Sequence, residues 1–338
     1  MNLYSMIMRC RNQLYKNKWL KTSRLSCPVI AVGNISVGGT GKTAIVDFLL
    51  SELKKQNVKV GVISRGYKGE YKKTTEVSLE HPNPSKEFGD EVSMLKWKHN
   101  HAPIFVGKKR VDAGLALLKK YPDTELILAD DAYQHQSLYR DLNICLLDMT
   151  EDPTDLKVLP FGRLREDFAP ALKRADLVLM TKANLSSTEN YQSWMGVLED
   201  INFQGPVYKV NFFNNKFIHL KTHETKSELQ GRALAFSGLA KPEVFAGALK
   251  KNSAINLIEA MAFKDHMSYN KKHIESLLVS KQQLSADFFV TTAKDAIKLL
   301  NEKEITENTW VAELDLEVLG VSNYEAQFIT EIIGIIRP

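Results

Sequence analysis

The stretch from Val29 to Thr43 has the composition of a phosphate-binding loop. It reads Val-Ile-Ala-Val-Gly-Asn-Ile-Ser-Val-Gly-Gly-Thr-Gly-Lys-Thr, an apolar strand followed by a glycine-rich turn that opens a helix. Small residues let backbone N–H groups surround phosphate oxygens, and a helix N-terminus adds partial positive charge. In such a loop Lys42 contacts the β- and γ-phosphates, and the Thr43 hydroxyl binds Mg²⁺. The predicted nucleotide-binding residues are Ser36, Val37, Gly38, Gly39, Thr40, Gly41, Lys42 and Thr43.

The loop departs from the usual GxxxxGK[ST] pattern at one position. Glycine is expected at position 36, where this chain has Ser36, and Gly38, Gly39 and Gly41 supply the flexibility instead. A glycine-rich turn with a purely structural purpose is the alternative. The strand before the loop and the helix after it favour phosphate binding.

A second apolar strand ends in two adjacent carboxylates, Asp130 and Asp131. In doubly wound sheets the ligand lies at the carboxyl ends of the strands, and a strand-end aspartate often provides the second anchor for a metal ion. Asp130 and Asp131 are therefore candidate Mg²⁺ residues. An aspartate pair that caps a turn is the structural alternative.

Alternating strands and helices must position these groups. From Pro28 onward, short β-branched runs alternate with helical stretches, which predicts an α/β protein with a mainly parallel sheet flanked by helices. The expected strands are 29–32, 58–63, 104–106, 126–129, 143–147 and 177–180. The expected helices are 42–56, 91–99, 111–121 and 189–201, and the connections 65–73, 81–89 and 149–165 read as loops.

A second, smaller α/β lobe is expected to start near Gly205 to Asn215. Pro206 interrupts the pattern there, and the Asn-rich run from Asn211 to Asn215 predicts a turn. The expected organisation is a basic amphipathic helix over 1–25, a core over 26–210 and a C-terminal lobe over 211–338, whose last helix packs back on the core.

Composition places the chain among ordinary folded proteins. Of its 338 residues, 44% are apolar and 25% charged, which excludes disordered and low-complexity classes. The three cysteines, Cys10, Cys27 and Cys145, have no metal-binding spacing and suggest a reducing compartment. No stretch approaches the roughly 20 apolar residues of a membrane span, and the first 30 residues lack a signal-peptide pattern. We therefore expect the body of the protein in the cytoplasm.

The excess positive charge is confined to the N-terminal segment. Without six basic residues of this segment, the chain has 39 bases against 40 acids. These six are Arg9, Arg11, Lys16, Lys18, Lys21 and Arg24. Apolar residues at helical spacing lie between them, which suits an anionic lipid surface. A terminal helix that packs on the body with a solvated basic face is equally compatible. The uniformly basic body of a nucleic-acid binder is absent, so we expect no nucleic-acid partner.

A family resemblance emerges around the second carboxylate strand. The segment Asp130-Asp-Ala-Tyr-Gln-His-Gln136 resembles the DDGFQH signature of the tetraacyldisaccharide 4′-kinases of lipid A biosynthesis. Six further motifs match that family in order: 33–43 with its Ser36, 64–67, 88–91, 162–166, 263–266 and 290–295. Val92, Met267 and Ala293 depart from the family pattern. The resemblance implies a P-loop nucleoside triphosphate hydrolase-like fold.

The resemblance also implies an activity and roles for loop residues. The family transfers the γ-phosphate of ATP, with Mg²⁺, to the 4′-hydroxyl of tetraacyldisaccharide 1-phosphate. Asp90 resembles the family's catalytic base and His266 its second acid/base residue, while Arg165 resembles a phosphate contact and Glu166 a metal contact. Judged without the family, Asp90 reads as a helix cap, His266 as an ordinary histidine, and Arg165 with Glu166 as a solvated pair.

A lipid acceptor gives the N-terminal segment a purpose. Since acyl chains keep the acceptor in the membrane, the resemblance favours docking of residues 1–25 at the cytoplasmic face of the inner membrane of a Gram-negative bacterium. The expected protein is a peripheral, monomeric kinase whose partners are the glycolipid and the membrane surface.

Two other functions are also compatible with the sequence. A P-loop GTPase or metallochaperone-type NTPase is suggested by Thr181-Lys-Ala-Asn184, which resembles the guanine-reading NKxD at the end of a strand. Asn184 replaces the aspartate that pairs with guanine, so guanine selectivity should be weak. A non-catalytic, membrane-associated nucleotide-binding module is the second alternative.

Overall fold

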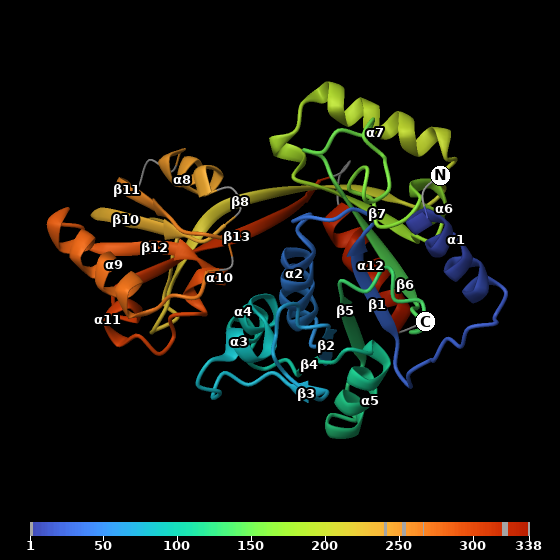
Figure 1. Ribbon diagram of the computed structural model, residues 1–338, viewed down its shortest axis with the longest axis horizontal. Helices are drawn as coiled ribbons and strands as arrows, with labels where there is room; N and C mark the ends of the chain where they lie inside the picture. Colours follow the sequence, from blue (N-terminus) through green and yellow to red (C-terminus); the bar gives the residue numbers. More distant parts are fainter. Residues whose placement is uncertain (1–2, 240–241, 252–254, 266, 320–323, 337–338) are drawn as a thin grey trace.

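The computed structural model describes residues 3–239, 242–251, 255–265, 267–319 and 324–336. These residues form one 13-stranded, mainly parallel sheet with helices on its faces (Figure 1). The strand order is β11-β10-β12-β13-β8-β7-β6-β1-β5-β2-β4-β3, with β9 beside β8. The predicted fold class is thereby confirmed.

The half of the sheet that carries the phosphate loop is parallel from β4 to β8. Its strands are β1 (Val29–Asn34), β2 (Val60–Ser64), β4 (Ile104–Val106), β5 (Leu126–Asp130), β6 (Leu142–Asp148) and β7 (Leu177–Thr181), and β3 (Thr75–Glu76) joins the edge antiparallel. Each expected strand is confirmed, with its ends moved by at most two residues. Because β1 lies between β5 and β6, its carboxyl end is central to the sheet.

Helices cover both faces of this half. They are α2 (Lys42–Lys55), α3 (Pro84–Phe88), α4 (Asp90–Lys98), α5 (Arg110–Lys120), α6 (Phe168–Leu172), α7 (Thr188–Asp200) and the 3₁₀ turn η1 (Ala183–Leu185). The four expected helices are confirmed, while α3 lies inside a segment expected to be a loop. Ile30 and Val32 pack with α2, whereas Val29 and Ala31 pack with α5, as strand alternation requires.

The C-terminal lobe extends the same sheet. Its elements are β10 (Arg232–Ser237), α8 (Pro242–Lys251), β11 (Asn256–Ala262), α9 (Lys271–Gln283), β12 (Phe288–Thr292), α10 (Ala293–Ala296) and α11 (Lys303–Thr306). Figure 1 shows them at one end of the molecule and the core strands at the other. The long strands β8 (Val207–His219) and β13 (Thr309–Leu319) pair antiparallel and run between the two lobes, with β9 (Thr225–Lys226) beside β8.

The predicted turn at Asn211–Asn215 is wrong. The strand β8 continues through this run and pairs with β13 on one side, and its first residues pair with β7 on the other. Strand propensity depends on context, and pairing with β13 along one edge overrides the turn preference of asparagine in this run. After β13 the chain returns to the core as α12 (Tyr324–Ile336), whose Phe328 and Ile332 are buried in the cluster that contains Val32 and Val210.

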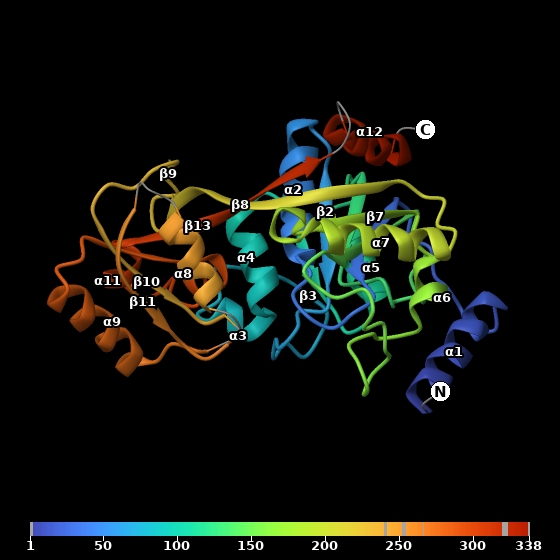
Figure 2. The same cartoon turned by 90° about the horizontal axis from the view of Figure 1, so that it is seen from above.

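The N-terminal helix α1 (Leu3–Lys16) lies at the end of the molecule opposite the C-terminal lobe (Figures 1 and 2). It ends well before residue 25, and the segment from Asn17 to Ser26 is irregular. Among the described helices, none combines the length and apolar character of a membrane span.

Candidate active site

The loop between β1 and α2 depends on glycine at two turns. Gly38 has φ +129° and Gly41, which precedes α2, has φ +89°, values that side chains rarely adopt. A Cβ on Gly41 would also lie 2.5 Å from the ring of Phe212. These two glycines therefore supply the conformations that the sequence analysis assigned to the loop.

A second segment holds the start of the loop as a short ladder. The Val37 N–H donates to the Arg163 carbonyl (2.8 Å), and the Arg165 N–H donates to the Ile35 carbonyl (2.8 Å). Ser36 forms an isolated bridge with Leu164 between them. The Val37 N–H is thus engaged within the protein, and its contact with phosphate stays a prediction.

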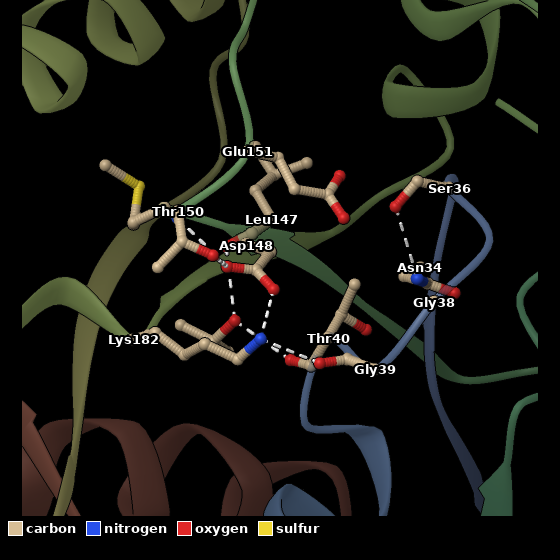
Figure 3. A network of polar contacts seen from close by, with 12 residues as sticks. Asn34, Ser36, Gly38, Gly39, Thr40, Leu147, Asp148, Thr150, Glu151 and Lys182 are labelled. Atoms are coloured by element: carbon tan, nitrogen blue, oxygen red, sulfur yellow. Dashed lines mark hydrogen bonds and ion pairs between the residues drawn. The ribbon is translucent and has the colours of Figure 1, made fainter. Parts of the chain in front are cut away.

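The end of β7 supports the middle of the loop (Figure 3). The Lys182 ammonium donates to the Gly39 carbonyl (2.8 Å) and pairs with Asp148. The Thr181 hydroxyl donates to the Thr40 carbonyl (2.9 Å). These contacts tie the turn to β6 and β7, the two strands next to β1 on that side.

Asn184 has a structural contact. Its side-chain amide donates to the Phe212 carbonyl (2.9 Å), and its side-chain oxygen accepts from the Phe212 N–H (3.1 Å). Both polar groups of Asn184 therefore hold η1 against β8.

The loop lysine meets the predicted acidic strand end. Lys42 Nζ lies 3.3 Å from Asn34 Oδ1, 3.4 Å from the Gly38 carbonyl and 3.7 Å from Asp131 Oδ1. The Arg165 guanidinium lies 3.0 Å from the same Asp131 oxygen. Burial raises the pKa of Asp131, but Lys42 and Arg165 outweigh it, so the net shift is downward and the group stays ionised. The structure thus brings Lys42, Asp131 and Arg165 together.

Asp130 is completely buried and only partly satisfied. Its Oδ2 accepts from the Ser64 hydroxyl (3.3 Å), whereas Oδ1 has no hydrogen-bond partner. Burial, followed by the charges of Glu91 and Asp131, raises the pKa of Asp130 to about 7. An unpartnered buried carboxylate oxygen costs free energy that a bound cation would recover.

The donor set suits Mg²⁺ bound together with phosphates. Thr43 lies in the first turn of α2 and is buried. In the described ranges, no three His, Cys, Asp or Glu side chains gather closely enough to hold a metal ion by themselves. Mg²⁺ typically takes one or two protein ligands and completes its shell with water and substrate phosphate, so Thr43 and Asp130 fit that pattern.

The predicted base lies in the first turn of α4. Asp90 follows Gly89, which has φ +101° and occupies the cap position, so Asp90 is the first helical residue and not the cap. Lys298 Nζ lies 3.3 Å from Asp90 Oδ2, and Lys294 Nζ lies 2.7 Å from Glu91 Oε1. The predicted catalytic residue His266 lies outside the described residues.

Both lysines and the buried Arg110 lie beside the site but were not among the residues predicted from the sequence. Lys294 lies within the motif 290–295, which could have indicated it, whereas no motif pointed to Lys298. Arg110, at the start of α5, donates to the carbonyls of Asp130 (3.0 Å) and Asp131 (3.2 Å). Together with burial, its charge lowers the pKa of His135 to about 4, so that imidazole is neutral near pH 7.

Glu166 takes part in a different set of contacts. Arg174 donates to its Oε1 (2.6 Å), and Asn12 of α1 donates to its Oε2 (2.8 Å). Both oxygens of this buried side chain are therefore engaged. Its role as a metal contact stays a prediction.

The fold and the site define a P-loop nucleotide-dependent enzyme. A family model for tetraacyldisaccharide-1-P 4′-kinase matches residues 1–333. The tetraacyldisaccharide 4′-kinase of Bdellovibrio bacteriovorus is 31% identical over 98% of this chain and 97% of the relative, and that of Syntrophotalea carbinolica is 33% identical over 88% and 81%. A crystal structure of LpxK from Aquifex aeolicus in complex with ATP has a TM-score of 0.76 and 30% identity, covering 99% of this chain and 96% of that one.

The chain therefore belongs to the tetraacyldisaccharide 4′-kinase family, which confirms the resemblance noted in the sequence. Its members are kinases, and this assignment is supported over the GTPase and metallochaperone alternative.

Proposed function

We propose that this chain transfers the γ-phosphate of ATP to the 4′-hydroxyl of tetraacyldisaccharide 1-phosphate. The observation that carries the proposal is that α4, which bears Asp90 and Glu91, packs beside the helix that follows the phosphate loop, where Lys98 of α4 pairs with Asp47 of α2. The charge of Glu91 raises the pKa of Asp130, and the charges of Lys294 and Lys42 lower the pKa of Glu91 against the effect of its burial. Glu91, the residue after Asp90, thus shares one electrostatic site with the loop lysine and Asp130.

The residues divide the chemistry between them. Lys42 and Arg165 neutralise phosphate charge, which is where most of the catalytic effect in phosphoryl transfer arises. Asp90 accepts the proton of the 4′-hydroxyl while that oxygen bonds to the γ-phosphorus and the bond to the β–γ bridging oxygen breaks, releasing ADP. Thr43 and Asp130 would hold Mg²⁺, with Asp131 beside them, and the bound ion would supply positive charge to the phosphate oxygens.

The test is incubation of the purified chain with labelled ATP, Mg²⁺ and tetraacyldisaccharide 1-phosphate, followed by chromatography of the lipid. We expect label in the glycolipid, and much less with GTP. Asp90→Asn should still bind ATP but lose about 100-fold or more in transfer, as removal of a general base does. ATP hydrolysis with no labelled lipid, or an unaltered Asp90→Asn variant, would contradict the proposal.

We further propose that α1 and the segment after it dock on the cytoplasmic surface of the inner membrane. The polar side of α1 is fixed to the core: the Tyr4 hydroxyl donates to the Arg165 carbonyl (2.9 Å), and Asn12 donates to Glu166. Apolar side chains of α1 and of the segment after it face solvent: Ile7 in the helix is 57% exposed, and Trp19 beyond its end is 77% exposed. This exposed apolar surface, flanked by cations, is typical of helices that lie in a membrane interface.

Vesicle binding tests this orientation. Ile7→Ser/Trp19→Ser should reduce co-sedimentation with phosphatidylglycerol-containing vesicles several-fold, since each lost apolar side chain weakens interfacial partition. The control Leu115→Ser/Val279→Ser removes two comparably exposed apolar side chains from α5 and α9. Equal loss of binding in both variants would argue against a specific role for α1.

A further inference from the structure

A buried lysine of the C-terminal lobe lies between two carboxylates that come from different lobes. The Lys298 side chain is only 6% exposed. Its Nζ is 3.3 Å from Asp90 Oδ2 and 3.6 Å from Asp295 Oδ1. A buried ammonium is costly unless it is paired, so both contacts stabilise its position.

Asp295 is a fixed anchor for that lysine. It is fully buried and accepts hydrogen bonds from the Thr292 hydroxyl (2.7 Å), the Gly238 N–H (3.0 Å) and the Tyr269 hydroxyl (3.0 Å). Burial and the charge of Asp295 raise the pKa of Tyr269, and the charge of Asp90 adds to this shift. Asp90 therefore belongs to the same electrostatic cluster as the C-terminal lobe residues.

The neighbouring lysine offers a contrast. Lys294 pairs with Glu91 at 2.7 Å, but both side chains are 33% exposed, so solvent screens that pair. The contact between Lys298 and Asp90 is shielded from solvent. Of these two lysines, Lys298 is thus the more deeply buried, and it is the one that contacts Asp90.

We propose that Lys298 is a positioning residue that holds the Asp90 carboxylate in the orientation needed to accept the proton of the acceptor hydroxyl. A general base must lie within hydrogen-bond reach of the proton that it abstracts, and loss of orientation is costly in rate. Because Asp295 fixes Lys298, the C-terminal lobe sets the geometry of a base on the other lobe. This inference rests on the proposed function, in which Asp90 is the base.

The experiment measures kcat and KM for ATP in the full chain with the glycolipid acceptor. Lys298→Met should lower kcat by about 10- to 100-fold, less than full loss of the base, and leave KM for ATP within about twofold. Lys298→Arg should recover most of the lost kcat, since it restores a cationic donor. Lys303→Met, an exposed lysine on α11, is the control and should match the unmodified chain.

A double-variant cycle separates positioning from a structural role. If Lys298 acts through Asp90, then Lys298→Met in an Asp90→Asn background should lower transfer by less than about threefold further. Independent, multiplicative losses would overturn the inference, as would a loss expressed only in KM. If Lys298→Met fails to fold, Lys298→Gln, which keeps a donor without the charge, is measured in the same cycle.

The two proposals fail in different ways. An unmodified chain that does not phosphorylate the glycolipid removes the proposed function. Suppose instead that the unmodified chain is active, that Asp90→Asn is inactive, and that Lys298→Met and Lys298→Gln both keep full activity. Only the role of Lys298 would then be contradicted.

Discussion

Asp130 is a carboxylate whose surroundings disfavour its charge. Since its pKa is raised to about 7, the folded protein binds a proton that the unfolded chain has already lost above pH 4. Stability from this group is therefore present below pH 4 and is lost as the pH rises toward 7. A cation bound to Oδ1 would reverse this loss.

We expect Asp130→Asn to remove this pH dependence. Without Mg²⁺ or nucleotide, we compare the free energy of unfolding of the variant with that of the unmodified chain at pH 5 and at pH 8. The stability gained by the variant should be about 1 to 3 kcal/mol larger at pH 8 than at pH 5. Urea denaturation at both pH values measures the difference. An equal difference at the two pH values would contradict the buried, partly protonated carboxyl.

Asp131 provides a control, because its contribution to stability changes with pH in the opposite direction. Its pKa is lowered in the folded protein because Lys42 and Arg165 outweigh its burial, so its contribution is present above pH 4 and is lost in acid. Asp131→Asn should therefore destabilise the chain at pH 8 and have little effect in strong acid. Asparagine tolerates the left-handed backbone at this position (φ +46°), so the substitution tests charge and not strain.

Site residues could be predicted where they lie close together in the sequence. Lys42, Thr43, Asp130 and Asp131 lie in short continuous motifs whose chemistry is readable from residue types. Lys298 lies more than 200 positions after its partner Asp90, and no local pattern announces that contact. The engagement of Glu166 by Arg174 also depends on tertiary packing.

One side chain of η1 is hydrogen-bonded to β8. Asn184 makes two hydrogen bonds with Phe212, one as donor and one as acceptor. An aspartate at this position would lose the donor and place a negative oxygen beside a carbonyl. Asn184→Asp should therefore lower the free energy of unfolding by about 0.5 to 1.5 kcal/mol and give no preference for GTP.

Thermal denaturation and parallel assays with ATP and GTP check this prediction. Asn17→Asp, at an exposed site where the side-chain oxygen only accepts a bond from Gln13, is the control. A variant of Asn184 with normal stability and new GTP-dependent activity would show that the segment reads the base.

The elements of the core were predictable because burial and periodicity agree in them. β1 is buried at every position, and its apolar run has the length of a strand. β8 was not predictable, because its polar residues extend beyond the core to pair with β13, which the chain forms about 100 residues later. Through the Asn-rich run, the strand conformation is imposed by that partner.

A buried ion-pair cluster ties the crossing strands to the nucleotide-binding helix. Lys98 of α4 pairs with Asp47 of α2 and with Glu313 of β13, and His99 Nε2 lies 2.6 Å from Asp47 Oδ1. The Lys98 side chain is 10% exposed. Glu313 lies beside the register shift of β13, so this cluster joins the two lobes where the strand pairing is irregular.

We expect Lys98→Met to destabilise the whole molecule by about 3 to 5 kcal/mol, since it removes the cation that two buried carboxylates share and leaves Asp47 with His99 alone. Guanidinium denaturation measures the loss. The control is Lys216→Met, which removes the more exposed ion pair between Lys216 of β8 and Asp315 of β13. It should cost less than about 1 kcal/mol. Similar losses in both variants would show that burial of the cluster does not matter.

The return of α12 to the core has a consequence for synthesis. Phe328, Ile329 and Ile332 complete the hydrophobic cluster around α2 and β1, yet the ribosome makes them after the entire C-terminal lobe. During translation, an apolar face of the nucleotide-binding half therefore stays exposed to solvent until α12 emerges from the ribosome. Nascent chains stalled before residue 324 should consequently recruit holdase chaperones through the phosphate-loop half, even when the later-made lobe has already folded.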